Sequence, residues 1–411
     1  MKNYCLSALL IYVLLFLLCS CGDHGKAADY SNFENGCVLD GTFYDIYLGY
    51  KVRRWNRDYE TVEEGLCRDP LCTHDGRDSL CPDNEALFKY SIVTDGEKLY
   101  LHTLDLNPHE EEGLFCHIFS IDPDGGNFTQ LYSHTGTSNN PYTIQVDNGW
   151  LYYAQAYYND DYDPGKGVVT SEDQYMNIMR MKTTGGKPEV VIGEKLSVGC
   201  SFFLDKTRYY LLLPDGSVKV TERESGREQV IPAETFCGTV LEILRLGDRT
   251  FLSSADPVNG VCPTEGGGEH ECSYNDRYLY EYRDGAFIPV VERASWLACD
   301  NSAVYYGKES RIYLGTRDEP TGRPGETAPI DYFETTLDCI YCIDLADGGV
   351  TEYLPGKTFP SGGNLLNPYA ADSGLFAYAG NRRNAYEGTG GYHMCRIVFG
   401  DGTFDVEKYY N

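Results

Sequence analysis

A short motif recurs along most of the chain, and this repetition limits the fold more than any other feature of the sequence. In its full form, an Asp is followed after three variable residues by an apolar, an aromatic and a second apolar or aromatic residue. Full copies begin at Asp95, Asp147, Asp205 and Asp300, and copies one residue shorter begin at Asp40, Asp248 and Asp372. Such apolar and aromatic runs favour β-strands. The intervals of 43 to 72 residues between copies are close to the length of a β-propeller blade.

A second strand-like segment and a glycine turn follow most copies of the motif. The turns fall at Asp124-Gly125, Gly185-Gly186, Asp284-Gly285, Asp347-Gly348 and Asp401-Gly402, and such pairs supply the positive φ angles that two-residue hairpins need. One four-stranded unit cannot bury both of its faces, so the units must stack in a ring. The sequence therefore predicts an all-β chain folded as a single β-propeller of seven blades, or of six if Asp40 begins a closing strand.

The N-terminal segment has the pattern of a bacterial lipoprotein signal. An apolar run from Ala8 to Leu18 is followed by Leu18-Cys19-Ser20-Cys21, in which Cys21 has a small residue before it and an aliphatic residue at −3. We expect residues 1–20 to be removed, Cys21 to carry the lipid, residues 21–35 to form a tether and residues 36–411 to form the propeller. The alternatives are a plain secretory signal or a membrane helix, although the run is short against the roughly 20 residues that a spanning helix needs.

The charge balance excludes one class of partner. Asp and Glu number 62 against 34 Lys and Arg, which gives a formal net charge of −28. A field of this sign repels phosphate backbones, so we expect no nucleic-acid binding.

Residues 67–82 contain the densest group of metal-binding residue types in the chain. Cys67, Cys72, His74 and Cys81 lie within fifteen residues, and three thiolates with one imidazole are a ligand set of structural zinc sites. The alternative is a disulfide among the three cysteines, which an exported protein permits. Elsewhere, Cys262 and Cys272 flank one loop and could form a disulfide across it. Cys339 and Cys342 are three apart in a strand and should point to opposite faces.

The Cys/His segment also resembles a known group of proteins. Cys67-Arg-Asp-Pro-Leu-Cys72-Thr-His74, with the later Cys81-Pro82, is similar to a segment of uncharacterised exported lipoproteins of Gram-positive anaerobes, where it lies between the first two propeller repeats. The stretch from Ile118 to Gly126 resembles TolB-type blades. The resemblance implies a TolB-like propeller in the cell envelope, anchored on the outer side of the cytoplasmic membrane. It implies no reaction.

The sequence assigns no catalytic or cofactor-binding residue. It contains no nucleophile elbow, Walker loop or His-Glu-x-x-His motif. We therefore expect a membrane-anchored extracytoplasmic module that binds or scaffolds a protein or glycan ligand, rather than an enzyme. The alternative is a hydrolase acting on glycans or peptides, with its site at the axial end of the propeller.

Overall fold

A computed structural model shows the chain as a set of antiparallel sheets. It describes residues 30–33, 36–40, 42–47, 49, 51–55, 62–69, 71–72, 74, 81–105, 114–137, 143–162, 170–246, 248–299, 302–320, 327–359, 364–371, 374–380 and 393–410. Within these residues the helical elements are two single 3-10 turns, η2 (Ser171–Asp173) and η3 (Ala233–Thr235). The prediction of an all-β chain with little helix is confirmed.

The first five sheets each form from consecutive strands. Blade 1 consists of β1 (Tyr30–Phe33), β2 (Gly36–Leu39), β3 (Thr42–Tyr47), β4 (Lys51–Trp55) and β5 (Val62–Glu64). Blade 2 consists of β6 (Leu87–Thr94), β7 (Leu99–Asp105), β8 (Leu114–Ile121) and β9 (Thr129–Gly136). Blade 3 consists of β10 (Ile144–Asp147), β11 (Trp150–Tyr158), β12 (Gln174–Lys182) and β13 (Glu189–Leu196). Blade 4 consists of β14 (Ser201–Leu204), β15 (Arg208–Leu212), β16 (Val218–Glu222) and β17 (Glu228–Ile231). Blade 5 consists of β18 (Thr239–Leu246), β19 (Arg249–Pro263), β20 (Glu269–Arg283) and β21 (Ala286–Ala294).

The sixth sheet has eight strands and contains two four-stranded halves. The first half is β22 (Trp296–Cys299), β23 (Ala303–Pro320), β24 (Thr327–Asp344) and β25 (Val350–Pro355), and the second is β26 (Asn364–Ala371), β27 (Gly374–Gly380), β28 (His393–Phe399) and β29 (Thr403–Tyr410). The halves join through a short parallel pairing of β25 with β29, where Leu354 lies opposite Thr403 and Pro355 opposite Phe404. The described sheets therefore give six blades rather than the expected seven. The reason is not a closing strand at Asp40, which lies within the first sheet, but the repeat that starts at Asp372, whose strands join the last sheet.

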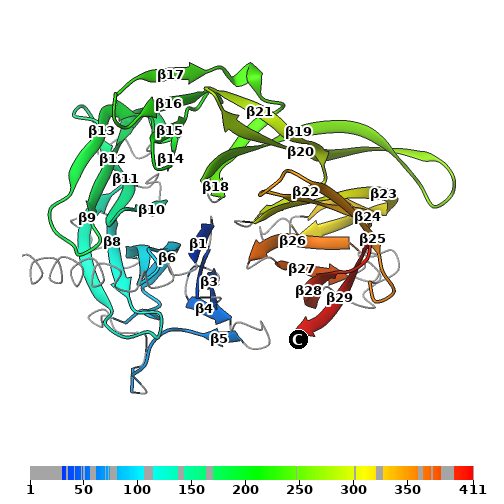
Figure 1. Cartoon of the computed structure of the whole chain (residues 1–411), viewed down its shortest axis with the longest axis horizontal. Helices are drawn as coiled ribbons and strands as arrows, with labels where there is room; N and C mark the ends of the chain where they lie inside the picture. The colour runs from blue at the N-terminus through cyan, green and yellow to red at the C-terminus, as the bar shows by residue number, and fades with distance from the viewer. Residues whose placement is uncertain are drawn as a thin grey trace, which may run out of the picture.

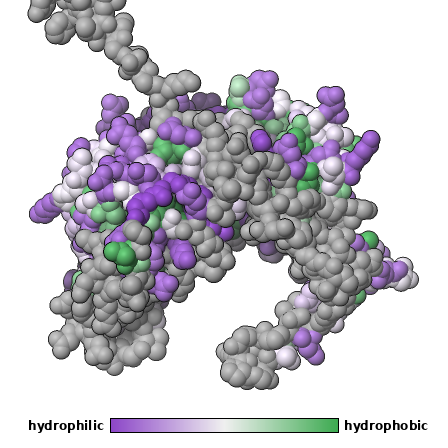
Figure 2. Space-filling view, turned by 90° about the horizontal axis from the view of Figure 1, so that it is seen from below, coloured by the Kyte–Doolittle hydropathy of each residue, from purple (hydrophilic) through white to green (hydrophobic). Residues whose placement is uncertain are grey.

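The sheets follow one another around an arc in chain order (Figure 1). The first sheet, in blue, and the last strands, in red, lie at the two ends of this arc. Buried apolar side chains join successive sheets: Val52 of blade 1 packs in one cluster with Ile92 and Leu99 of blade 2, and Tyr153 of blade 3 packs in another with Ile118 of blade 2. The core is thus distributed between neighbouring sheets, as stacked repeats require. On the face seen in Figure 2, hydrophobic patches of the described residues are small and separate within a mostly hydrophilic surface.

The repeated motif has a structural cause. Asp205 follows β14 and accepts hydrogen bonds from the backbone amides of Thr207 (2.6 Å) and Arg208 (2.8 Å), which closes the turn into β15. The same carboxylate accepts the hydroxyl of Tyr210 at 2.6 Å. In blade 2, Asp95 caps the corresponding turn and accepts the hydroxyl of Tyr100 at 2.7 Å. The motif therefore pairs a turn-capping Asp with a buried Tyr of the following strand.

Of the five predicted glycine turns, only the one at Asp284-Gly285 is a two-residue hairpin, whereas the other four lie in longer connections between strands. Asp284 and Gly285 connect β20 to β21 and both have positive φ angles, 50° and 86°. Positive values at both central residues are what a tight two-residue hairpin needs to match the twist of its strands. The predicted hairpin turn at this position is confirmed.

Candidate metal centre

The Cys/His segment lies between β5 of blade 1 and β6 of blade 2. Local hydrogen bonds shape it: the amide of Cys72 donates to the carbonyl of Asp69 at 3.1 Å, and the amide of Leu71 donates to the Asp69 carboxylate at 2.9 Å. An Asp side chain that accepts a hydrogen bond from the backbone amide two residues later favours a tight turn. The turn reverses the chain between Cys67 and Cys72.

Asp83 holds the two ends of the segment together. Its buried carboxylate accepts the backbone amide of Leu66 at 3.0 Å and that of Cys67 at 2.6 Å. Gly65 makes this approach feasible, because a Cβ added there would lie 2.6 Å from the Asp83 oxygen, and its φ is +90°. These contacts bring the start of the segment against Cys81.

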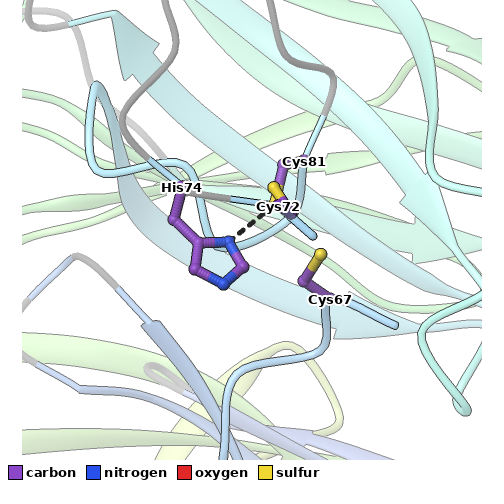
Figure 3. A group of neighbouring side chains, drawn as sticks. All are labelled: Cys67, Cys72, His74 and Cys81. Atoms are coloured by element: carbon purple, nitrogen blue, oxygen red, sulfur yellow. Dashed lines mark hydrogen bonds between the residues drawn. The ribbon is translucent and has the colours of Figure 1, made fainter. Parts of the chain in front are cut away.

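The four predicted ligands converge on one point. Their ligand atoms all lie within 4.8 Å of one another, and the Nδ1 of His74 is 3.2 Å from the Sγ of Cys81. Figure 3 shows the side chains of Cys67 and His74 directed toward those of Cys72 and Cys81. Ligands about 2.3 Å from a tetrahedral zinc would lie roughly 3.8 Å apart, so the cluster needs little contraction to hold the ion.

The three cysteines of the cluster are free thiols. Cys81 is buried, whereas Cys67 and Cys72 are partly exposed. Burial raises the pKa of Cys81, and the neighbouring Cys67 and Cys72 raise it further. A metal that binds here must therefore displace the Cys81 proton, as is usual for thiolate sites.

His74 occupies an uncommon backbone conformation. Its φ is +61°, in the left-handed region, which costs a non-glycine residue about 1–2 kcal/mol. Its carbonyl accepts the amide of Glu85 at 3.0 Å, which ties this position to the start of blade 2. Strained positions of this kind gather at functional sites, and this one lies within the Cys/His segment.

A buried lysine lies beside the cluster. Lys89 of β6 is 2% exposed, and its Nζ donates to the carbonyl of Asn84 at 2.9 Å. Burial lowers the pKa of Lys89 to about 8, although the nearby Asp83, Cys81 and Glu85 act to raise it. One positive charge is therefore available next to Cys81.

The segment also contacts the outer hairpin of blade 2. A Cβ added to Gly125 would lie 1.9 Å from the carbonyl oxygen of Leu66, so the hairpin turn passes against the segment. The guanidinium of Arg68 donates to the backbone carbonyl of Asp124. The hydroxyl of Tyr44 in blade 1 donates to the backbone carbonyl of Pro123 at 3.1 Å. The Cys/His segment is thus packed where the first two blades meet.

The structure brings together all four predicted ligands. The sequence did not single out Asp83 and Lys89, although an Asp two residues after a ligand cysteine and a Lys inside an apolar strand were visible signals. Cys21, the predicted lipid attachment site, lies outside the described residues. The predicted disulfide between Cys262 and Cys272 is present, and Cys339 and Cys342 are not joined to each other. Within the described part of the chain, no helix has the length and apolar character to cross a membrane.

Comparison with known proteins gives distant likenesses only. No protein-family model and no curated protein matches the sequence. One similar solved structure is the acylaminoacyl peptidase of Pyrococcus horikoshii, with 13% identity over 93% of this chain and 52% of that chain and a TM-score of 0.47. Another is the N-terminal domain of Nup159, with 11% identity over 83% of this chain and 84% of that chain and a TM-score of 0.35. A third is an oligogalacturonate lyase in complex with manganese, with 10% identity over 72% of this chain and 74% of that chain and a TM-score of 0.37. At such scores these likenesses carry nothing about activity, and the propeller arrangement rests on the sheet topology.

Proposed function

We propose that this chain is an extracytoplasmic binding or scaffolding propeller, attached through Cys21 to the outer side of the cytoplasmic membrane. The observation that supports a binding role most directly is a pair of hairpins that extend from the blades. In blade 5, β18 pairs with β19 up to Ala255, and β21 pairs with β20 from Arg277. Beyond these positions β19 and β20 pair with each other as a two-stranded ribbon, residues 256–276, which we name arm 1.

The sixth sheet carries a second ribbon. β22 pairs with β23 up to Gly307 and β25 pairs with β24 from Ile340, so residues 308–320 and 327–339 pair only with each other, as a second ribbon that we name arm 2. Thr264 of arm 1 and Tyr313 of arm 2 form a parallel bridge. The long strands of both arms are visible on the right of Figure 1.

Side chains fix the arms to one another. The ring of His270 in arm 1 stacks on that of Tyr313 in arm 2 with centroids 3.6 Å apart, and its Nε2 lies 3.3 Å from the carboxylate of Asp331. The guanidinium of Arg311 lies 4.5 Å from the ring centre of Tyr274. The Cys262–Cys272 disulfide links the two strands of arm 1. A pre-ordered extension of this kind costs less conformational entropy when a partner binds, and protruding loops on rigid scaffolds often bind ligands.

We further propose that Cys67, Cys72, His74 and Cys81 hold a structural Zn²⁺. Three thiolates around Zn²⁺ leave one net negative charge, and the buried ammonium of Lys89 would partly offset this charge and that of the Asp83 carboxylate. Four protein ligands make a closed site, which suits a structural rather than a catalytic role. The ion would fix the segment between blades 1 and 2.

Site-specific photo-cross-linking tests the binding role. A benzophenone amino acid would replace Val261, which is 60% exposed in arm 1, or Val230, which is 57% exposed on β17 and serves as the matched control. In cells that export the chain, we expect a discrete protein or glycan adduct from position 261 and none above background from position 230. Equal labelling from the two positions, or turnover of glycan or peptide substrates by the purified chain, would contradict the proposal.

A further inference from the structure

A second group of metal-binding side chains lies inside the molecule, away from the Cys/His segment. His102 of β7, Cys116 of β8 and His134 of β9 have ligand atoms that all lie within 4.8 Å of one another. Their exposed fractions are 0%, 0% and 5%. The three residues come from three neighbouring strands of blade 2 and belong to a group separate from the first cluster.

Strand register places the three side chains on one face. Cys116 lies opposite Leu104 on β7 and opposite His134 on β9. His102 is two residues from Leu104, so it shares the face of Cys116. This face packs against blade 3, because the ring of Tyr153 on β11 lies 6.2 Å from that of His102 and 5.7 Å from that of His134. The cluster is therefore enclosed between two blades.

The hydrogen bonding of His134 leaves one ring nitrogen for a ligand role. Its Nδ1 donates to the carbonyl of Thr135 at 3.1 Å. A histidine that binds a metal through one ring nitrogen usually donates a hydrogen bond from the other in this way. The Nε2 of His134 is buried and has no hydrogen-bond partner among the described residues.

Other polar atoms at this junction are unsatisfied too. The hydroxyl of Tyr153 and the side-chain oxygen of Gln155, both on β11, are buried without a hydrogen-bond partner among the described residues. Buried polar atoms without partners cost free energy and are uncommon in proteins. The ring of Tyr153 contacts both imidazoles, so its unsatisfied hydroxyl adds a polar atom to the surroundings of the two histidines and the cysteine.

We propose that His102, Cys116 and His134 bind a soft monovalent cation, Cu⁺, between blades 2 and 3. Soft thiolate and imidazole ligands suit both Cu⁺ and Zn²⁺. Charge decides between them: Cu⁺ with the single thiolate is neutral, whereas Zn²⁺ would leave a net positive charge in an interior position, which is costly. This site is independent of the binding role and of the Cys67–Cys81 zinc site.

Copper titration of the zinc-loaded full chain, followed by X-ray absorption at the copper edge, tests the site. We expect one equivalent of Cu⁺ to remain in the presence of a competing chelator, with an absorption fit to two nitrogen neighbours and one sulfur. His134→Phe and Cys116→Val should each weaken copper binding by at least about 100-fold, because losing a ligand costs more than disturbing its hydrogen-bond partner. His74→Ala should release zinc and leave this copper in place.

His117→Phe is the matched control. His117 is next to Cys116 on β8 and points to the opposite face, where its ring lies 5.8 Å from that of Phe119. We expect this variant to retain the copper. Three results would overturn the proposal. The first is copper that is lost in His74→Ala and kept in His134→Phe, the second is an absorption fit with three sulfur neighbours, and the third is that the unmodified chain retains no copper. A second zinc equivalent that disappears in His134→Phe would overturn the choice of a monovalent ion. If His134→Phe does not fold, the fit on the unmodified chain still decides.

Discussion

The hydroxyl of Tyr210 donates a 2.6 Å hydrogen bond to the carboxylate of Asp205, five residues earlier in the chain. Tyr100 and Asp95 repeat this contact in blade 2 at 2.7 Å. In blade 3 an arginine joins the pair instead: Arg223 donates to the carboxylate of Asp147 at 2.7 Å and to the hydroxyl of Tyr152 at 2.9 Å. The sequence repeat is therefore maintained by a polar contact as well as by apolar packing.

Removing the Tyr210 hydroxyl should destabilise the fold. Asp205 is 8% exposed, and a hydrogen bond to a buried charged acceptor contributes about 1–3 kcal/mol. We expect Tyr210→Phe to lower the free energy of urea unfolding by this amount. Tyr341→Phe, which removes a 2.8 Å hydrogen bond to exposed Glu352, is the control and should change it by less than about 0.5 kcal/mol. Equal losses in both variants would contradict this explanation.

Asp205 should also make stability depend on pH. Burial raises the pKa of its carboxyl, but hydrogen bonds from Tyr210, Thr207 and Thr250 outweigh burial and leave the pKa below its usual value. A carboxyl with a lowered folded-state pKa stabilises the protein fully above its unfolded pKa of about 3.9 and loses this contribution as the pH falls further. The difference in unfolding free energy between the natural chain and Asp205→Asn should therefore stay constant above about pH 5 and shrink as the pH falls below about 4. A difference that also stays constant below about pH 4 would contradict the prediction.

Zinc binding by the Cys/His cluster should require both its cysteines and its histidine. We expect the purified chain to contain about one equivalent of zinc, and His74→Ala to release it, because a structural site needs its fourth ligand. Cys72→Ala should lower the unfolding temperature as well as the zinc content. Metal analysis and thiol counting without reductant or chelator provide the measurement. A zinc content that is unchanged in His74→Ala would rule out the imidazole as a ligand.

The Cys262–Cys272 disulfide should stabilise arm 1 without affecting the blades. Both cysteines lie in the part of β19 and β20 that extends beyond the neighbouring strands. In Cys262→Ser, amide hydrogen exchange should accelerate within residues 256–276, while the unfolding temperature should change by less than about 2 °C. Faster exchange throughout blade 5 would show that the arm and the blade unfold together.

Lipid attachment gives a test of location. We expect Cys21→Ser to abolish acyl labelling and leave the precursor unprocessed, because Cys21 has Ser20 before it and Leu18 at −3. Cys19→Ser should be processed normally. Equal acyl labelling of both variants would contradict the prediction that Cys21 carries the lipid.

Local features were predictable from the sequence, and contacts between distant strands were not. Asp205 and Tyr210 belong to a visible repeat, and the ligand set from Cys67 to Cys81 is compact enough to be recognised from residue types alone. His102, Cys116 and His134 lie on three strands, and each looks like an ordinary core residue until the register places them on one face. Likewise, nothing near His270 indicates that its ring will stack on Tyr313, since the two arms arise from different sheets.

The parallel pairing of β25 with β29 has a consequence for aggregation. A strand at the edge of a sheet offers unpaired backbone groups that can join a strand of another molecule. Here the amide of Leu354 donates to the carbonyl of Gly402 at 3.0 Å, and that of Gly356 donates to the carbonyl of Phe404 at 2.7 Å. The outermost strands of the two halves thus occupy each other's edges at this point. A substitution that separates them would expose two edges at once, and we would expect it to promote self-association before it unfolds either half.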